Sequence, residues 1–369
     1  MIYTIDLIKS ELEKTYKIKH KGSGTFSEVF CLKKKNEKKF IIKIFNFFDE
    51  TEYDLNGENI EILNILNISK ILKEKNEKNI DFLINMKQYG IIAKKINDIT
   101  IKHEFFIMEY FKMNLNDLIK KLRKEKIILK IDQKIEILKK IALNIKFFHD
   151  IYYIHGDLKP KNILLNKSYN NIKICDYGLT FLNKNKFTSS KSYEIFLKYK
   201  EDLLKCKSNK DKNIEDLKKK FEDFFIIDQL VTLRYRAPEI LFYKFNSYEK
   251  IDIWSFGCIM FELLYEKKIF SIKKFKNESC YIMLVLYSNF FGFNWCEEFF
   301  FSPFITQKTK KYILKKIDQK NKNHIPIVKK KKYENINELI LKCLNKNFLE
   351  RPTINEILNH SFFNKNKIK

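Results

Sequence analysis

The sequence predicts an α+β fold with two lobes, a small β-rich lobe followed by a larger helical one. Short β-favouring runs surround turn residues between positions 16 and 48, and two more strand-like runs occur at residues 82–92 and 103–111. After about residue 115, apolar residues instead recur every three or four positions over long segments. A chain of 369 residues, 45% of them hydrophobic, is large enough to bury the cores of two lobes.

The small lobe is expected to start at residue 16, after an N-terminal extension of residues 1–15. Residues 16–48 then predict strands around two turns, one containing glycine and one rich in Asn and Lys. Residues 52–73 predict a helix, because certain side chains recur there at steps of three and four residues. The recurring residues are Leu55, Ile62, Ile65, Leu66 and Ser69.

The two later strands are expected to be separated by a polar connection around residues 94–100. A hinge near residue 111 would then lead into the helical lobe. Segments with the period of a helix dominate that lobe, at residues 115–150, 252–266 and 334–359. The second lobe is therefore predicted to be built mainly from helices.

Lysine dominates the charge of the chain. There are 72 basic and 46 acidic residues, so the formal net charge is +26, and such a field favours acidic or polyanionic partners. The alternative is a drift toward A/T-rich codons, because Lys, Asn, Ile and Phe are over-used throughout. In either case the four arginines, eight glycines and five prolines indicate geometry that the common residues cannot supply.

Cysteine usage and hydropathy predict an intracellular protein, cytoplasmic or nuclear, without a membrane span. The seven cysteines include no C-x-x-C pair, which argues for a reducing compartment and against a disulfide framework or a structural zinc site. Asp6 and Lys9 interrupt the N-terminus too early for a signal peptide. The aromatic stretch at residues 287–304 has glutamates in its middle, and the lysine run at residues 329–332 is a candidate nuclear-import signal.

The segment GSGTFSEV places Gly22 and Gly24 between two predicted strands. Glycines let backbone N–H groups approach phosphate oxygens, and they tolerate φ values that other residues avoid. A plain hairpin turn would show the same pattern, and Ser27 stands where a third glycine is familiar. The segment therefore indicates a phosphate-binding loop only together with the motifs that follow.

The segment FIIK supplies a lysine for such a loop. Strand alternation puts Lys43 on the same face as Ile41 and Phe45, so its ammonium group would need an anion. Glu58 and Glu61 on the following helix are the candidates. Glu61 is favoured because it shares the inward face of that helix, and the ion pair would hold the lysine against nucleotide phosphates.

The string YIHGDLKPKNILL contains the strongest chemical signal. Asp157 and Asn162 are five residues apart, and Asp176 follows Asp157 by nineteen residues, after an apolar run. Phosphoryl transfer needs a carboxylate aimed at the attacking hydroxyl and hard oxygen ligands for Mg²⁺. These three residues fit those roles, and packing alone does not require this pattern.

Residues 16–363 resemble a eukaryotic-type serine/threonine protein kinase domain. The motifs occur in the family's order: the glycine loop, FIIK, HGDLKPKN, DYG, APE, DIWSFG and a late arginine. The resemblance implies the protein kinase fold, with an N-lobe at about 16–110, a C-lobe at about 111–363 and a basic tail at 364–369. It also implies ATP and Mg²⁺ as cofactors, and transfer of the γ-phosphoryl group to hydroxyls of a protein substrate.

The resemblance also assigns roles to residues. Asp157 would accept the proton of the substrate hydroxyl, Lys159 would steady the moving phosphoryl group, and Asn162 and Asp176 would hold the metal. The residues implied for ATP binding are Gly22, Ser23, Gly24, Thr25, Phe26, Ser27, Val29, Lys43, Glu61, Met108, Glu109 and Phe111, with backbone groups of the last three facing adenine. The residues implied for the structural and substrate platform are Thr232, Arg236, Glu239, Asp252 and Arg351, with Asp252 bracing the catalytic loop and Arg351 pairing with Glu239.

Three other functions are weighed against this one. A catalytically inactive kinase-like scaffold is the first, but every charged group that the chemistry needs is present. A small-molecule phosphotransferase of the H-G-D type would explain Gly156, but Lys159 and the segment after Thr232 resemble protein kinases instead. A nucleic-acid-binding protein is motivated only by the net charge, because no recognised nucleic-acid motif occurs.

Within the family, TLRYRAPEI resembles the CMGC group, which holds the cyclin-dependent, mitogen-activated, glycogen-synthase and Cdc2-like kinases. Gly156 replaces the usual arginine, as in the branch of dual-specificity tyrosine-regulated, Cdc2-like and SR-protein kinases. Without that arginine, a phosphate on the activation segment lacks its cationic partner, which predicts activity without phosphorylation there. SR-type substrates are cationic, so either the acidic residues cluster at the groove or the substrate belongs to another class.

Several positions depart from the family pattern. Ile41 stands where alanine usually covers adenine, and Tyr177 replaces a phenylalanine. The Lys-rich insert at about 183–223 lengthens the activation segment and is either a docking element for a regulatory partner or a tolerated surface insertion. Cys175 is expected to be a small buried hydrophobe, and His155 a packing and hydrogen-bonding residue.

Overall fold

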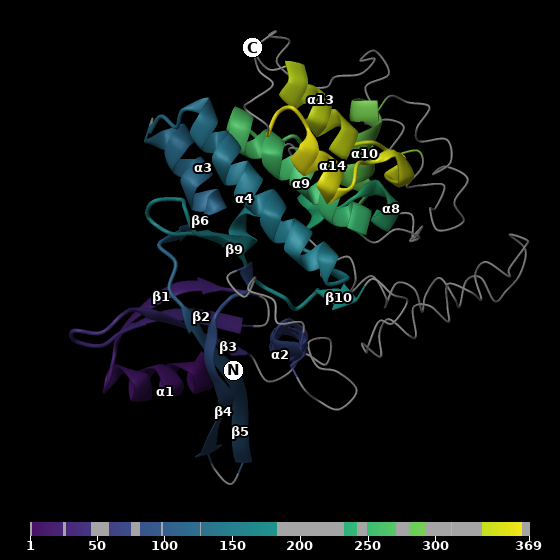
Figure 1. The fold of residues 1–369 in the computed structure, drawn as a ribbon. Helices are drawn as coiled ribbons and strands as arrows, with labels where there is room; N and C mark the ends of the chain where they lie inside the picture. Colours follow the sequence, from purple (N-terminus) through teal and green to yellow (C-terminus); the bar gives the residue numbers. More distant parts are fainter. Residues whose placement is uncertain are drawn as a thin grey trace, which may run out of the picture. The chain divides into compact units, whose positions relative to one another are not determined.

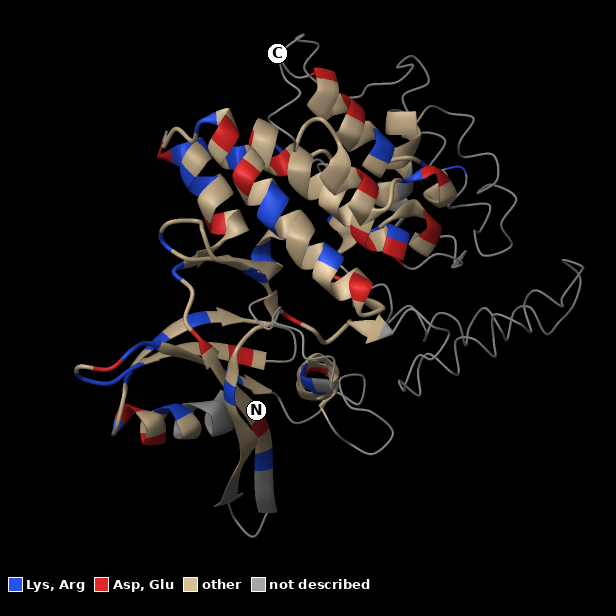
Figure 2. Ribbon diagram, viewed as in Figure 1, with Lys and Arg blue, Asp and Glu red and all other residues tan. Residues whose placement is uncertain are grey.

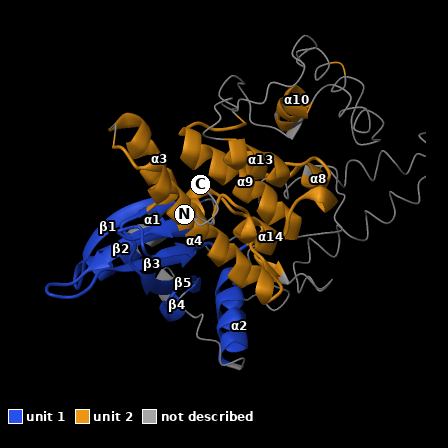
Figure 3. Ribbon diagram, turned by 45° about the horizontal axis from the view of Figure 1, so that its top comes forward, with its two compact units in different colours: residues 1–113, 164–178, 189–191 blue, residues 114–163, 179–188, 192–369 orange. Residues whose placement is uncertain are grey.

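The computed structural model falls into two compact units (Figure 3). The first comprises residues 1–113, 164–178 and 189–191, and the second comprises residues 114–163, 179–188 and 192–369. The structure describes residues 2–24, 27–45, 59–74, 82–96, 99–125, 127–182, 232–241, 249–270, 280–291, 311 and 334–363. The boundary at Met113 lies close to the hinge expected near residue 111, but the return of residues 164–178 to the first unit was not predicted.

The first unit is built on a five-stranded antiparallel sheet with the strand order β1-β2-β3-β5-β4 (Figure 1). Its strands are β1 (Lys17–Ser23), β2 (Ser27–Lys33), β3 (Phe40–Phe45), β4 (Met86–Ile96) and β5 (Ile99–Glu109). The strands expected within residues 16–48 are therefore confirmed. The turn residues at both connections allow each strand to pair with the next one along the chain.

The predicted polar connection around residues 94–100 is wrong. β4 and β5 stay paired through Lys95 opposite Thr100 and Ile96 opposite Ile99. The lysines suggested a loop, but isoleucine and threonine favour strands, and an antiparallel hairpin needs only a two-residue connection. That connection, residues 97–98, lies outside the described residues.

Helix α2 (Ile60–Glu74) begins later than the predicted start at residue 52. The Asn59 side chain accepts a hydrogen bond from the Ile62 N–H at 3.1 Å, which caps the first turn. Leu55 and Glu58 lie outside the described residues. The apolar side chains that the helix buries are Ile62, Ile65, Ile68 and Leu72.

The N-terminal extension forms helix α1 (Ile2–Glu13), which packs on one face of the sheet (Figure 1). Ile8 is only 6% exposed and belongs to a cluster with the buried residues Phe30, Leu32, Ile42 and Ile44. This helix was not predicted. It removes apolar sheet surface from water, so residues 1–15 are part of the folded first unit.

The Ile8→Ala variant is expected to lower the free energy of unfolding by about 2 kcal/mol, because it removes apolar contacts and leaves a cavity. Urea denaturation measures the change. Glu13→Ala is the matched control, because Glu13 is exposed on the same helix. Equal midpoints for the two variants would show that α1 contributes nothing to the stability of the sheet.

The second unit is helical. Its longer helices are α3 (Leu115–Lys124), α4 (Ile131–Asp150), α9 (Glu249–Tyr265), α10 (Cys280–Phe291) and α13 (Glu334–Cys343). A shorter helix, α14 (Ile354–Asn359), follows them. α9 contacts both α4 and α13, and every residue from Lys250 to Leu263 is buried. A helix buried on all sides forms the centre of a unit. The predicted segments at residues 115–150 and 334–359 each divide into two helices.

Short elements position the loops between these helices. The strand β7 (Tyr153–Ile154) pairs with β10 (Phe181–Leu182), and β8 (Ile163–Leu165) lies between β6 (Met113–Asn114) and β9 (Ile172–Ile174). A 3₁₀ turn (Pro160–Asn162) follows β7, another (Leu233–Tyr235) precedes the short helix α8 (Pro238–Leu241), and a third (Phe348–Glu350) precedes α14. Among the described residues, no helix is both long enough and apolar enough to cross a membrane.

Candidate functional site

The glycine segment forms the connection between β1 and β2. Gly22 lies opposite Val29, and the Gly24 N–H donates to the Ser27 carbonyl at 2.7 Å. Neither glycine has a positive φ. Their conformational freedom is therefore not used, and a side chain at Gly22 would meet no atom within 4 Å. Open space lies beside Gly22 only, because a Cβ at Gly24 would lie 3.3 Å from the Ser27 hydroxyl oxygen.

The other predicted members of this segment are only partly described. Ser23 lies opposite Glu28, and its hydroxyl donates to the Glu28 carboxylate at 2.9 Å. Thr25 and Phe26 lie outside the described residues. On the other side of β2, Val29 is paired with Lys43 of β3, so the glycine segment and the lysine belong to adjacent strands.

Lys43 is the centre of a group of charges in the first unit. Its side chain is 14% exposed, and its Nζ lies 2.5 Å from Oε2 of Glu61 and 3.1 Å from Oδ1 of Asp176. The expected ion pair with Glu61 is present. Phe45 lies on the same face, with its ring centroid 5.2 Å from Nζ. The ammonium group therefore has an aromatic ring and two carboxylates among its neighbours.

The two carboxylates keep the lysine charged. Burial alone would lower the pKa of Lys43, but the charges of Asp176 and Glu61 outweigh it and raise the pKa above its ordinary value. Burial also raises the pKa of Glu61, and the charge of Lys43 acts against that change. Lys43 is thus a permanent cation, and the Asp176 side chain beside it remains 40% exposed.

Asp176 and Tyr177 form a turn that hydrogen bonds hold in place. Asp176 has a φ of 74°, a left-handed conformation that aspartate tolerates better than most residues. The buried Tyr177 hydroxyl donates to the Ile174 carbonyl at 2.6 Å and accepts from the Ile84 N–H at 3.2 Å. The Tyr177 carbonyl accepts from the Asn64 amide of α2 at 2.8 Å. The change from phenylalanine therefore adds a hydroxyl that connects this turn to Ile174 of β9 and to Ile84, just before β4. The sequence analysis noted the change but not this role.

The predicted hinge lies at the end of β5. Met108 is opposite Ile41 of β3, so the two residues expected beside adenine are neighbours. The Glu109 carboxylate accepts from the buried Lys173 ammonium at 2.6 Å, and the Glu109 N–H donates to the Asn85 carbonyl at 3.3 Å. Phe111 is 8% exposed. Lys173 was missed, although a lysine between two isoleucines of a short strand is a signal for a buried cation.

The catalytic-loop residues meet in the second unit. Asp157 is 5% exposed, and its Oδ1 accepts from the Thr232 N–H at 3.2 Å. Its Oδ2 is ion-paired with the Lys159 ammonium. The Asn162 amide donates to the Asp157 carbonyl at 3.0 Å, and Lys159 also donates to the Thr232 hydroxyl at 2.9 Å. Asp157 and Asn162, predicted from their spacing, therefore form one hydrogen-bonded group with Lys159 and Thr232, which the resemblance implied.

The carboxylate of Asp252 in α9 accepts hydrogen bonds from the backbone of this loop. One carboxylate oxygen accepts from the His155 N–H at 2.9 Å, and the other accepts from the Gly156 N–H at 3.1 Å. His149 lies within 3.1 Å of the same carboxylate. The buried His155 ring accepts from the Asp157 N–H at 3.2 Å, so this histidine packs and hydrogen-bonds as expected.

Gly156 occupies a position that other residues cannot adopt without strain. Its φ is 78°, and a Cβ there would lie 2.6 Å from the Leu179 carbonyl oxygen. That oxygen belongs to the backbone just before β10, and the Thr180 hydroxyl donates to the His155 carbonyl at 3.2 Å. This backbone path therefore requires a glycine at position 156, where the resemblance leads one to expect an arginine.

The Gly156→Ala variant is expected to lower the free energy of unfolding by at least about 2 kcal/mol, because the left-handed φ and the contact with Leu179 both oppose a side chain. Thermal unfolding measures the change. Gly178→Ala is the control, since a Cβ at Gly178 would meet no atom within 4 Å. If both variants melt at the same temperature, the backbone at residue 156 is not constrained in this way.

The platform residues surround a buried ion pair. Arg351 donates from Nη1 to Oε1 of Glu239 at 2.6 Å and from Nη2 to Oε2 at 2.7 Å. The guanidinium also lies 4.9 Å from the ring centroid of Trp254. Arg236 is 1% exposed, and its carbonyl accepts from the Tyr287 hydroxyl. These contacts attach the segment that carries Thr232 to α9 and α10.

Some expectations are corrected or fall outside the described residues. Cys175 is only partly buried, so the expectation of a small buried hydrophobe is wrong. Its position after β9, where the chain turns toward Asp176, leaves it beside a partly exposed carboxylate. The insert at residues 183–223, the lysine run at 329–332 and the tail at 364–369 lie outside the described residues.

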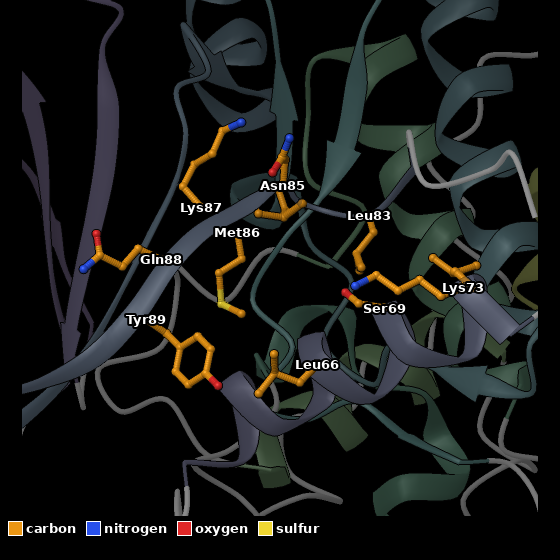
Figure 4. A pocket seen from close by; sticks show the side chains of 11 residues that line it. Leu66, Ser69, Lys73, Leu83, Asn85, Met86, Lys87, Gln88 and Tyr89 are labelled. Carbon is orange, nitrogen blue, oxygen red and sulfur yellow. The ribbon is translucent and has the colours of Figure 1, made fainter.

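A cavity of about 490 Å³ in the first unit was not predicted. It lies between α2 and the segment of residues 83–89, and Figure 4 shows Leu66, Leu83 and Met86 among the side chains of its wall, with Lys73 and Lys87 at its edge. None of the predicted site residues lines it. The helix α2 nevertheless contributes to both features: its residues line one side of this cavity, and its Glu61 is ion-paired with Lys43.

Comparisons with known proteins agree on one family. The protein kinase domain matches residues 16–200 and 216–363. Mitogen-activated protein kinase MKC1 of Candida albicans is 27% identical over 231 residues, which are 60% of this chain and 36% of that protein. Mitogen-activated protein kinase mpkB of Aspergillus fumigatus is 28% identical over 219 residues, or 59% of this chain and 50% of that protein.

A third relative covers less of the chain at higher identity. Mitogen-activated protein kinase spm1 of Schizosaccharomyces pombe is 33% identical over 139 residues, which are 37% of this chain and 25% of that protein. The chain therefore spans half or less of the length of these relatives. All three are mitogen-activated protein kinases, not members of the branch that Gly156 suggested, and the branch remains a prediction.

Proposed function

This chain belongs to the protein kinase domain family, and we propose that it is an ATP-dependent serine/threonine protein kinase of the CMGC group that transfers the γ-phosphoryl group to protein hydroxyls. The observation that carries the proposal is the surroundings of Asp157. A carboxylate there accepts from Thr232 and Lys159 and is contacted by Asn162. A catalytically inactive scaffold would not need a buried acid with this set of donors.

Asp157 is the residue that orients the substrate hydroxyl and accepts its proton. An ionised carboxylate has about four lone-pair positions, and here the Thr232 N–H, the Lys159 ammonium and the Asn162 amide all donate to it. The backbone on either side is held by Asp252 and Asn162, which keeps the acid in one orientation. General-base catalysis depends on such positioning. Lys159 places a positive charge next to the transferred phosphoryl group.

Lys43 provides the corresponding positive charge for the nucleotide. Its ammonium group stays charged between Glu61 and Asp176, and in this role it binds phosphate oxygens. The open space beside Gly22 lets backbone N–H groups approach the same phosphates. The segment from Met108 to Phe111 presents its backbone to adenine.

Asn162 and Asp176 fit a hard metal ion. The amide nitrogen of Asn162 is directed at Asp157, so its oxygen is the atom available to a cation, and Asp176 supplies a partly exposed carboxylate. Both are oxygen donors, which Mg²⁺ prefers. Mg²⁺, when bound, neutralises negative charge on the nucleotide phosphates.

Transfer of labelled phosphate tests the proposal. The purified protein is incubated with γ-labelled ATP, Mg²⁺ and a generic protein substrate, and label is expected on serine or threonine. Asp157→Ala is the control and is expected to give none. A folded wild-type protein that binds ATP but transfers no label would be the inactive scaffold. Label in choline or an aminoglycoside, and none in protein, would indicate the small-molecule phosphotransferase.

Treatment of the protein with a phosphatase is expected to leave the transfer rate within about tenfold of the untreated rate. The reason is that Gly156 replaces the arginine that would bind a phosphate on the activation segment. The loop is held instead by the hydrogen bond that the Gly156 N–H donates to the Asp252 carboxylate. Initial rates before and after treatment measure this. A larger loss would mean that phosphorylation of the segment is required.

The remaining expectations extend this proposal. A protein substrate follows from the kinase family, and the insert at residues 183–223 is the candidate docking element for a regulatory partner. An intracellular location, cytoplasmic or nuclear, is supported by the free buried thiols of Cys31, Cys258 and Cys343. The net charge alone does not favour nucleic acid over an acidic protein.

A further inference from the structure

A second, smaller cavity lies beside Asp157 in the second unit. Its volume is about 230 Å³, and its lining includes Lys159, Lys161, Thr232, Arg234, Tyr235 and Lys268. Two of these residues connect it directly to the catalytic loop. The Thr232 N–H donates to Asp157 at 3.2 Å, and the Lys159 ammonium is ion-paired with the same carboxylate.

Of the described residues, four basic ones and no acidic one line this cavity. Elsewhere, basic and acidic residues are interspersed along the helices (Figure 2). Lys159 is already paired with Asp157. Among the described residues, Lys161 and Arg234 have no carboxylate within 4 Å, and Lys268 lies 3.8 Å from Glu262.

Glu262 does not compensate these charges well. Its other oxygen accepts from the Tyr235 hydroxyl at 2.5 Å, and Lys268 lies only at the limit of an ion pair. Burial lowers the pKa of Lys268, Glu262 opposes that, and Arg234 and Lys161 lower it further. The cations therefore repel one another, and an anion placed among them would relieve that repulsion.

We propose that this cavity binds an anionic side chain of the protein substrate, carboxylate or phosphoserine, next to the hydroxyl that is phosphorylated. The inference rests on the proposed kinase function, and it identifies the substrate class. A chain that is extended beside Asp157 advances about 3.3 Å per residue, so the anionic residue lies within about three positions of the acceptor. The anionic residue would lie on the side of Asp157 where Thr232 and Lys159 are found, because both line the cavity and contact this carboxylate.

The same cavity selects against a cationic substrate. An arginine placed there would meet Lys161, Arg234 and Lys268, and like charges at close range are unfavourable. This resolves the conflict between a net charge of +26 and the arginine-rich substrates of the SR type. The cavity is also too small to follow a nucleic-acid backbone, because it holds a single anionic group.

The test uses short peptides with one serine that differ only near it, carrying glutamate, phosphoserine, alanine or arginine at each position from three before to three after. Binding without ATP and kcat/KM with ATP are both measured. At one position, glutamate or phosphoserine is expected to exceed alanine by about tenfold, and arginine to fall below it. The better of the two anions distinguishes an acidic substrate from a previously phosphorylated one.

Variants then assign the preference to the cavity. Lys161→Gln and Arg234→Gln are expected to reduce it, and the double variant Lys161→Glu with Arg234→Glu to favour arginine instead. Lys346→Glu is the matched control, because Lys346 is exposed and outside the cavity. The wild-type peptide series gives an answer even where a variant fails to fold.

Each outcome separates this inference from the proposed function. Equal binding of all four peptides by the wild type overturns the inference, whether or not any peptide is phosphorylated. A preference for anionic peptides without any phosphoryl transfer supports the cavity's selectivity and contradicts the kinase activity. Suppose that random DNA displaces the anionic peptide, and that Arg234→Gln weakens the binding of DNA and of peptide by the same factor. That result overturns the assignment to a protein substrate.

Discussion

The Asp157→Asn variant is expected to fold as the wild type does and to transfer phosphoryl groups at about one thousandth of the wild-type rate. Asparagine keeps the shape of the side chain and one acceptor oxygen, which the Thr232 N–H can still use. It cannot accept the proton of the substrate hydroxyl. Its amide nitrogen would also face the Lys159 ammonium in place of a carboxylate oxygen, which shifts that cation.

The measurement is kcat at saturating ATP and peptide, together with ATP affinity. The affinity is expected to change little, because the proposed phosphate contact is made by Lys43, whose ion pairs with Glu61 and Asp176 do not involve Asp157. Asp150→Asn is the matched control, because Asp150 is an exposed aspartate in α4 that is ion-paired with Lys146. A loss smaller than about tenfold in the Asp157 variant would assign the proton transfer to another group.

Charged residues inside apolar runs were the most informative part of the sequence. Lys43 in a strand required a partner, since an unpaired buried charge is costly, whereas the role of Asp252 was implied by the resemblance. The spacing of Asp157 and Asn162 placed both on one loop, and the structure brings them into contact. For these residues, local pattern and chemistry were sufficient.

Contacts between distant segments could not be predicted in the same way. The position of Lys173 between two isoleucines signals a buried cation, but nothing in the sequence identifies its partners, Glu109 and the Leu83 carbonyl. The role of the Tyr177 hydroxyl depends on the backbone of Ile84, 93 residues earlier. Such partners are set by the fold, and the lysine-rich composition hides them.

The same limit applies to the backbone. The pairing of β4 with β5 up to residue 99 was mistaken for a loop because lysines and asparagines dominate the segment. The start of α2 depends on the cap at Asn59, one of several asparagines there. The strain at Gly156 depends on the Leu179 carbonyl, which reaches it only through the pairing of β7 and β10. Periodicity predicts that an element exists more reliably than where it ends.

The Glu239→Ala variant is expected to lower the free energy of unfolding by about 3–5 kcal/mol, because it leaves a buried guanidinium without its carboxylate. The Arg351 side chain is fully buried, and Glu239 is its bidentate partner. The remaining acceptors, the carbonyls of Lys250 and Asn345, bear no formal charge to replace it. Water cannot easily reach the group, so the lost interaction is not replaced.

A double-mutant cycle separates the pair from its surroundings. Glu239→Leu with Arg351→Met removes both charges and is expected to recover much of the stability lost in either single variant. Arg351→Lys is expected to recover less, because an ammonium group cannot form the two parallel bonds. Urea denaturation measures all of them, and Lys342→Ala, which breaks the exposed pair with Glu338, is the control with an effect below about 0.5 kcal/mol.

Because Glu239 belongs to α8, just after the segment that carries Thr232 and Arg234, the loss should extend to substrate selection. At a temperature where the Glu239→Ala variant is still folded, its preference for anionic peptides is expected to weaken, while ATP affinity is retained. If stability falls but the peptide preference is unchanged, the ion pair supports only the helical core. If both fall together, the same buried charges stabilise the second unit and position its substrate-binding residues.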